Sequence, residues 1–157
     1  MIKYKPYILS VLLALSVGGI SALLVAGNYE LYDMVSMPPL SPPALVFPIV
    51  WSILYVLMGI SAAMVFTDRN AAMTKKKTAL KTYGISLILN FIWSIIFFNF
   101  GAFFIAFLVL TALLATIVKT ILEYKDINLV AALLQLPYLV WVVFAGYLNI
   151  GTWILNG

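Results

Sequence analysis

The stretch PPLSPPALVFPIVWSILYVLMG, from Pro38 to Gly59, decides the fold of this chain. Prolines gather at its start, and the last of them, Pro48, already lies inside an apolar run long enough to become a helix. Proline is tolerated in the first turn of a helix and kinks a helix further along. Beyond Pro48, Trp51 and Tyr55 follow at steps of three and four residues, so they share one helical face. A plain membrane anchor needs neither feature, so we expect this stretch to position something.

The whole chain is as apolar as this stretch. Its 157 residues are 65% hydrophobic and only 9% charged, and its mean hydropathy is +1.14. A water-soluble domain of this size needs far more polar residues to cover its surface. The composition therefore predicts an integral membrane protein.

Five segments reach the length of roughly 20 apolar residues that a helix needs to cross a bilayer. We expect helices because the strands of a membrane barrel are about half as long and alternate in polarity. The fold class is therefore predicted to be all-α, with residues 1–157 forming one domain, a bundle of five transmembrane helices. The predicted spans are about 6–26, 43–66, 80–99, 102–123 and 129–153.

The cations all fall on one side of this predicted bundle. With five spans, the N-terminus, the second loop and the fourth loop lie on the same side, and the opposite side carries only Glu30 and Asp33 as charged residues. The positive-inside rule then predicts a cytoplasmic N-terminus and an external C-terminus. We interpret Lys75-Lys76-Lys77 as a topogenic and lipid-headgroup cluster, so the lipid bilayer is an expected partner and nucleic acid is not. The cations are Lys3, Lys5, Arg69, Lys75, Lys76, Lys77, Lys81, Lys119 and Lys125.

Several kinds of chemistry are excluded by what the chain lacks. It has no cysteine and no histidine, which removes thiolate nucleophiles, the commonest metal ligand and the usual proton shuttle. The ionisable residues in or near the spans, Lys81, Lys119 and Glu123, lie at span ends, whereas ion pathways need charges near the middle of the membrane. We expect no metal site, no required cofactor, no ion pump and no conventional catalytic site.

Aromatic residues make up 15% of the chain, and three tryptophans lie several residues inside predicted spans. A belt at the membrane interface would place them at span ends instead. Because neighbouring spans run in opposite directions, Trp51, Trp93 and Trp141 can converge in the outer half of the bundle, beneath the first loop. There they would form one wall for a flat, mainly apolar ligand. The alternative, in which these rings pack between helices without any ligand, is also open.

Four separated motifs carry a resemblance to a known family. They are Pro42-Pro43 ahead of Val50-Trp51-x-x-Leu54-Tyr55-x-x-Met58-Gly59, then Asn90-x-x-Trp93-x-x-x-Phe97-Phe98, then Pro137-Tyr138-x-x-Trp141, and finally Leu148-Asn149. This series resembles the tryptophan-rich sensory protein/translocator protein family, whose animal members are the mitochondrial peripheral benzodiazepine receptors. Many members have Trp where this chain has Leu40. The charge bias suggests a bacterial member, and hence a multi-pass protein of the bacterial inner or plasma membrane.

The resemblance implies a membrane receptor or sensor that binds porphyrins, with protoporphyrin IX as the type ligand, and benzodiazepine-receptor-type ligands. Tyr32 would belong to a lid formed by the first loop, and Ala22 and Ala26 to a wall formed by the first helix. The ligand-binding residues that the resemblance implies are Ala22, Ala26, Tyr32, Phe47, Trp51, Tyr55, Asn90, Trp93, Pro137, Tyr138 and Trp141.

Two other functions stay open beside the receptor. In the first, the protein degrades photoexcited porphyrin with electrons from Trp51 and Trp141 or from Tyr138. In the second, it is a facilitative transporter of tetrapyrroles or lipids, since the chain shows no coupling-ion residues and no inverted repeat. Small residues four apart, such as Gly18 and Ala22, allow close helix packing within one chain or in a homodimer.

Overall fold

The computed structural model describes residues 2–26 and 34–156. Every regular element in these two ranges is a helix, as predicted. The elements are the 3-10 helix η1 (Ile2–Tyr4), α1 (Lys5–Val25), α3 (Val46–Phe66), α4 (Met73–Ser94), the π-helix η3 (Ile95–Asn99), α5 (Phe103–Lys125), α6 (Leu129–Leu134) and α7 (Leu136–Asn156).

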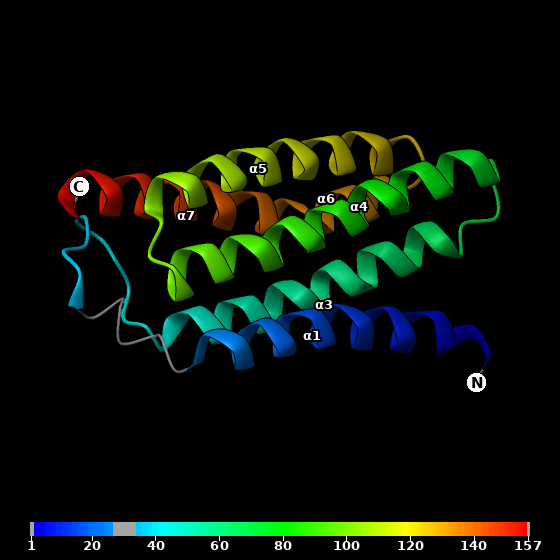
Figure 1. Cartoon of the computed structure of the whole chain (residues 1–157). Coiled ribbons are helices and arrows are strands. Elements are labelled where there is room, and N and C mark those ends of the chain that lie inside the picture. The colour runs from blue at the N-terminus through cyan, green and yellow to red at the C-terminus, as the bar shows by residue number, and fades with distance from the viewer. Residues whose placement is uncertain (1, 27–33, 157) are drawn as a thin grey trace.

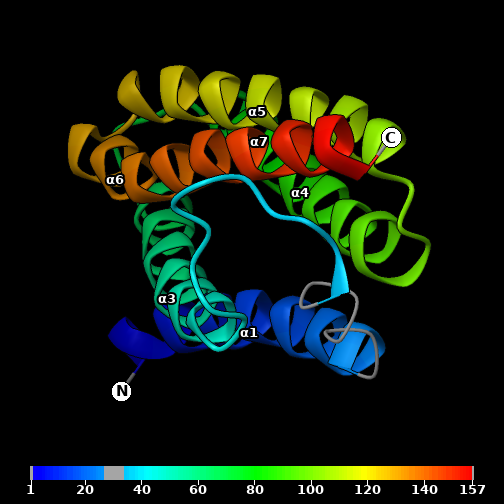
Figure 2. The same cartoon turned by 90° about the vertical axis from the view of Figure 1, so that its left-hand side faces the viewer.

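Within the described residues, five helical stretches are long and apolar enough to cross a membrane, so the five-span prediction is confirmed. They lie side by side in one bundle, and α1 begins at the opposite end from the one at which α7 ends (Figure 1). Seen from the latter end, the segment after residue 34 crosses the bundle from α1 toward α7 and returns to α3 (Figure 2). The five stretches are Lys5–Val25, Val46–Phe66, Met73–Asn99, Phe103–Lys125 and Leu129–Asn156.

The third span begins earlier than its apolar run suggested. α4 starts at Met73 instead of near residue 80, so Lys75-Lys76-Lys77 form its first turns and do not belong to a loop. Lys76 is buried, and its ammonium donates a hydrogen bond to the Asp68 carbonyl oxygen at 2.7 Å, just beyond the end of α3. A cation is favourable beside the carbonyls at a helix C-terminus, so Lys76 fixes the reversal between α3 and α4.

The fifth span is broken into two helices. α6 ends at Leu134 and α7 begins at Leu136, because Pro137 lacks the N–H that an unbroken helix would use. The intervening Gln135 is fully buried, and its Nε2 donates to the Ser61 hydroxyl of α3 at 3.2 Å. Ser61 in turn donates to the Ala131 carbonyl oxygen at 2.7 Å, which ties the break to α3.

Two glycines allow α1 to lie directly on α3. A Cβ on Gly18 would collide with the Tyr55 ring, and a Cβ on Gly59 would collide with the backbone of Val11. These small residues therefore serve packing within the chain, whereas a homodimer, the other arrangement that the sequence left open, is not tested by these contacts.

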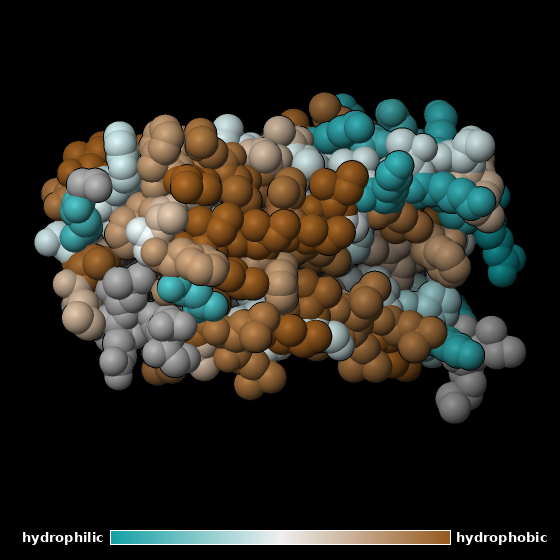
Figure 3. All heavy atoms as spheres, in the orientation of Figure 1, coloured by the Kyte–Doolittle hydropathy of each residue, from teal (hydrophilic) through white to brown (hydrophobic). Residues whose placement is uncertain are grey.

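The outer surface of the bundle suits a lipid environment. Hydrophobic residues cover its middle, and hydrophilic residues gather at the end where α1 begins and α3 turns into α4 (Figure 3). Leu12, Leu13 and Leu23 of α1 are each more than half exposed in the isolated chain. Contact with lipid tails explains such exposure, so the bilayer is the solvent for this surface.

Candidate functional site

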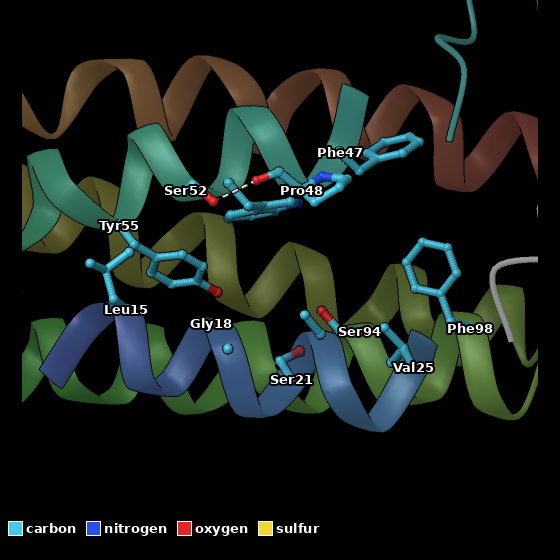
Figure 4. Close-up of a pocket in the computed structure, with 13 residues that line it drawn as sticks. Leu15, Gly18, Ser21, Val25, Phe47, Pro48, Ser52, Tyr55, Ser94 and Phe98 are labelled. Atoms are coloured by element: carbon cyan, nitrogen blue, oxygen red, sulfur yellow. Dashed lines mark hydrogen bonds between the residues drawn. The ribbon is translucent and has the colours of Figure 1, made fainter. Parts of the chain in front are cut away.

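A cavity of about 160 Å³ lies between α1, α3 and α4, toward the end of the bundle that residues 34–45 cross (Figure 4). Its walls combine aromatic rings with small and hydroxyl-bearing side chains, and none of the described residues that line it carries a charge. The residues that line it are Leu15, Gly18, Gly19, Ser21, Ala22, Val25, Phe47, Pro48, Trp51, Ser52, Tyr55, Ser94 and Phe98.

Tyr55 closes the cavity at its inner end. Its ring lies against Gly18 of α1, where any larger residue would push it away. Its hydroxyl accepts a hydrogen bond from Nδ2 of Asn90 at 2.8 Å, which holds the ring between α3 and α4. The carbonyl oxygen of the same Asn90 amide is buried and has no partner among the described residues. Trp51 lies one turn of α3 before Tyr55, nearer the end of the bundle that residues 34–45 cross, and the two ring centroids are 5.7 Å apart.

The π-helix η3 shapes the side formed by α4. A π-turn holds one more residue than an α-turn and is frequent at functional sites. Here Ser94 and Phe98 line the cavity, whereas Phe97 packs on Trp93 with ring centroids 5.5 Å apart. Nδ2 of Asn99 donates to the Leu24 carbonyl oxygen at 3.2 Å and so joins the π-helix to the end of α1.

Of the predicted ligand residues that the structure describes, four line this cavity and the others do not. Ala22, Phe47, Trp51 and Tyr55 line it, and Asn90 stands behind Tyr55. Tyr138 is fully buried behind Trp51, with the ring centroids 6.1 Å apart. Ala26 lies instead in a groove on the outer surface of α1, and Tyr32 lies outside the described residues.

The three tryptophans do not converge on one cavity, which corrects that expectation. Trp93 is held away from it, because its Nε1 donates to Oδ1 of Asn149 on α7 at 2.8 Å. Trp141 and Pro137 line a shallow apolar groove on the bundle surface between α3 and the α6–α7 break. The Trp141 ring packs edge-on against Phe47 at 5.9 Å. Of the three, only Trp51 lines the cavity.

Some lining residues were missed by reasoning from the sequence. Ser21, Ser52 and Ser94 are hydroxyl residues within strongly apolar spans, and that contrast was an available signal. Phe98 offered no such signal, since helical periodicity from Asn90 and Trp93 selects Phe97. Phe98 lies in the π-helix, four residues after the cavity-lining Ser94.

Residues 34–45, which we name the lid segment, are fastened to α7. Asn156 makes two hydrogen bonds with the backbone of Ser36: its Nδ2 donates to the carbonyl oxygen at 2.8 Å, and its Oδ1 accepts from the N–H at 3.0 Å. The Tyr147 hydroxyl donates to the Pro39 carbonyl oxygen at 2.6 Å. Gly151 lets Pro38 pack directly on α7, because a Cβ there would lie 2.7 Å from the proline ring.

The turn within the lid segment requires an uncommon backbone conformation. Leu40 has φ of +70° and is 85% exposed. A proline followed by a residue with a positive φ is typical of a type II turn, and Pro39 and Leu40 hold these two central positions. Glycine or asparagine is preferred at the position of Leu40. The Ser41 hydroxyl donates to the Pro38 carbonyl oxygen at 2.6 Å across this turn.

Comparison with known proteins places these features in a family. Residues 10–154 match the TspO/MBR family. The chain is 34% identical over 127 residues to the protein CrtK of Rhodobacter capsulatus, which covers 80% of this chain and 78% of the relative. It is 32% identical to the tryptophan-rich protein TspO of Archaeoglobus fulgidus over 94% of both chains. It is 29% identical to the translocator protein of Bos taurus over 80% of this chain and 75% of the relative.

The family match spans all five helices and includes every residue that lines the cavity. It agrees with the five apolar spans and with the resemblance drawn from the motifs. The chain therefore belongs to the TspO/MBR family of five-helix membrane proteins, and this membership supports a role as a membrane receptor or sensor.

Proposed function

We propose that this protein is a membrane receptor or sensor for porphyrin-type tetrapyrroles, with protoporphyrin IX as the reference ligand, and that benzodiazepine-receptor-type ligands bind at the same place. The observation that carries the proposal is an uncharged cavity with Trp51, Tyr55, Phe47 and Phe98 in its walls. Aromatic faces suit a flat conjugated ring, and apolar walls with few polar groups are typical of small-molecule sites.

The side chains of the cavity favour a metal-free porphyrin over haem. The chain has no histidine or cysteine to ligate an iron, and the cavity walls hold no methionine. Of the haem ligands that proteins commonly use, the described residues of the cavity offer only a tyrosine oxygen, and the Tyr55 hydroxyl already accepts the bond from Asn90. Stacking on Trp51 does not require a metal, so protoporphyrin IX keeps its main contacts.

Titration of the purified protein with protoporphyrin IX and with haem, followed by quenching of tryptophan fluorescence, tests this proposal. We expect tighter binding of protoporphyrin IX and a loss of about tenfold in affinity for Trp51→Ala. Trp153→Ala is the matched control, because Trp153 packs on Phe104 of α5 and does not line the cavity. Much tighter binding of haem, or an unchanged affinity of Trp51→Ala, would contradict the proposal.

A second candidate activity is the light-dependent breakdown of the bound porphyrin. Trp51 lies on the cavity and has Tyr55 and Tyr138 at ring distances of 5.7 and 6.1 Å. Its indole can therefore donate an electron to the photoexcited porphyrin, a neighbouring phenol can reduce the indole radical cation, and the phenol proton can pass to the reduced porphyrin. Trp51→Phe should then stop the light-dependent loss of the porphyrin spectrum and largely preserve binding. Trp141→Phe is the control, because Trp141 lies outside the cavity; an equal loss of activity in both variants would contradict the role of Trp51.

We further propose that the protein resides in a bacterial plasma membrane with its N-terminus in the cytoplasm. The support is the concentration of lysines at the end where α1 begins, together with the bacterial relatives. Reporter fusions at the two termini should show the N-terminus inside and the C-terminus outside. The reverse pattern would overturn the orientation and leave the ligand proposal untouched.

A further inference from the structure

We infer that the ligand reaches the cavity sideways from the membrane, through an opening between α1 and α3 bordered by Gly19, Ala22 and Pro48. We name this opening the side portal. The inference rests on the proposed function, since it concerns the route taken by the ligand of the same cavity. It assigns the ligand to a chemical class: flat, mainly apolar molecules dissolved in the leaflet nearer the lid segment.

The first observation is where the close packing of α1 on α3 ends. Gly59 lies against the backbone of Val11, and about one turn of α3 nearer the lid end Tyr55 lies against Gly18. Beyond Gly18 the two helices no longer touch so closely, and the cavity occupies the space between them (Figure 4). The separation thus begins at the inner end of the cavity.

The second observation is that the cavity and the membrane-facing surface share three residues. Gly19, Ala22 and Pro48 line the cavity and also line a groove on the outer surface of α1. The two spaces therefore adjoin at these residues. A Cβ built on Gly19 would have no neighbour within 4 Å, so this side of the meeting point is open. The other residues of the groove are Ser16, Ile20, Leu23 and Ala26.

The third observation is that the polar residues at the portal are already satisfied. The Ser52 hydroxyl donates to the Pro48 carbonyl oxygen at 2.7 Å, and the Ser16 hydroxyl donates to the Leu12 carbonyl oxygen at 2.6 Å. Hydroxyls bonded back to their own helix expose no free donor, so they are tolerated next to lipid tails. The portal therefore offers an apolar ligand a path without a polar barrier.

The fourth observation concerns the route through the lid end. The lid segment is fastened to α7 by the Asn156 and Tyr147 hydrogen bonds, and the side chains of Val25, Phe47 and Phe98 are all buried at that end. Entry from water would require these contacts to open, whereas entry through the portal leaves them in place. The portal also lets a ligand larger than the cavity extend into the groove, which matters because typical ligand sites measure about 300–1,000 Å³.

A single engineered thiol tests the portal, because the chain has no cysteine of its own. The Gly19→Cys variant is labelled in detergent with a methyl or a benzyl methanethiosulfonate and then reconstituted in liposomes. Rates of protoporphyrin IX association and dissociation are followed by tryptophan quenching. Gly84→Cys on α4 is the matched control, since a Cβ at Gly84 also has no neighbour within 4 Å and Gly84 lies outside the cavity and the groove.

We expect the benzyl adduct at position 19 to slow association and dissociation together by about tenfold or more, with little change in affinity. Both adducts at position 84 should leave the rates within about twofold, and the methyl adduct at position 19 should slow them less than the benzyl adduct does. A benzyl adduct at position 19 that leaves both rates unchanged would overturn the inference. So would a weaker affinity without slower dissociation, because the adduct would then be filling the cavity and not obstructing a route.

A disulfide between Ser36→Cys and Asn156→Cys tests the alternative route through the lid end. The two positions are close, since the Asn156 side chain already reaches the Ser36 backbone. With this bond formed, the lid segment stays on α7, and we expect ligand rates equal to those of the reduced protein. A large slowing on oxidation, reversed by reductant, would assign entry to the lid end and overturn the portal. If protoporphyrin IX does not bind the unmodified protein at equilibrium, the proposed function fails; normal binding with rates insensitive to position 19 refutes the portal alone.

Discussion

Asn90 of α4 and Tyr55 of α3 are joined by a buried hydrogen bond of 2.8 Å directly behind the cavity. α3 and α4 are consecutive in sequence and join at the opposite end of the bundle, so this bond is a link between them far from their shared turn (Figure 1). It fixes the Tyr55 ring against Gly18 and thereby sets the inner end of the cavity.

Tyr55→Phe should destabilise the protein by roughly 1–3 kcal/mol, because it removes the acceptor of the Asn90 Nδ2 hydrogen bond. The Oδ1 of the same buried amide already has no partner among the described residues. Asn90→Leu removes that amide, so the double variant should recover part of the loss. Thermal unfolding of the two single variants and the double variant in one detergent measures this coupling. Strictly additive losses would show that the bond does not link the two helices.

Gly18→Ala should lower the unfolding midpoint, because the added methyl group must displace the Tyr55 ring or push α1 away from α3. Gly19→Ala should raise the midpoint slightly, since its methyl group meets no neighbour and alanine is a better helix former by up to about 1 kcal/mol. The two residues are adjacent in one helix, which makes them a matched pair in thermal unfolding. Equal midpoints for both variants would contradict the close contact at Gly18.

Trp93→Phe should reduce stability without weakening ligand binding by more than about twofold. The substitution leaves Oδ1 of Asn149 buried without its donor, which costs on the order of 1–3 kcal/mol. It keeps an aromatic ring beside Phe97 and Phe98 and does not touch the cavity wall. A stable Trp93→Phe protein with lost porphyrin affinity would assign Trp93 to the ligand after all.

Asn156→Ala and Tyr147→Phe should each loosen the lid segment. Loss of these bonds frees the backbone at Ser36 and at Pro39, so amide hydrogen exchange in residues 34–41 should accelerate. The free energy of global unfolding should change by only about 0.5–1.5 kcal/mol. Asn70→Ala, in the turn at the other end of the bundle, should leave exchange in the lid segment unchanged.

Leu40→Gly should stabilise the protein by about 1 kcal/mol, since a positive φ costs a residue with a Cβ roughly that amount. The leucine side chain is almost fully exposed, so little packing is lost in the isolated protein. Leu45→Gly is the control: Leu45 is also exposed but has φ of −63°, and glycine there should destabilise. Unfolding midpoints that fall in both variants would contradict strain at Leu40.

The sequence alone determined the five spans, the clustering of cations at one end and the shared face of Trp51 and Tyr55. The bilayer makes this possible, because each span must satisfy its own backbone hydrogen bonds, and a sufficient run of apolar residues therefore specifies a helix. Lys75-Lys76-Lys77 shows the limit of this rule. Hydropathy places the start of the third span near residue 80, but the helix already begins at Met73, where Lys76 donates a hydrogen bond to the Asp68 carbonyl oxygen.

Only the tertiary structure decided which aromatic residues line the cavity. A leucine or tryptophan that faces lipid is chemically the same as one that faces another helix, so no hydrophobic pattern separates the two faces of a span. Contacts from other helices make the choice: Asn149 holds Trp93 away from the cavity, and Phe47 packs against Trp141. These contacts join residues far apart in the chain, and they exist only once the helices have packed together.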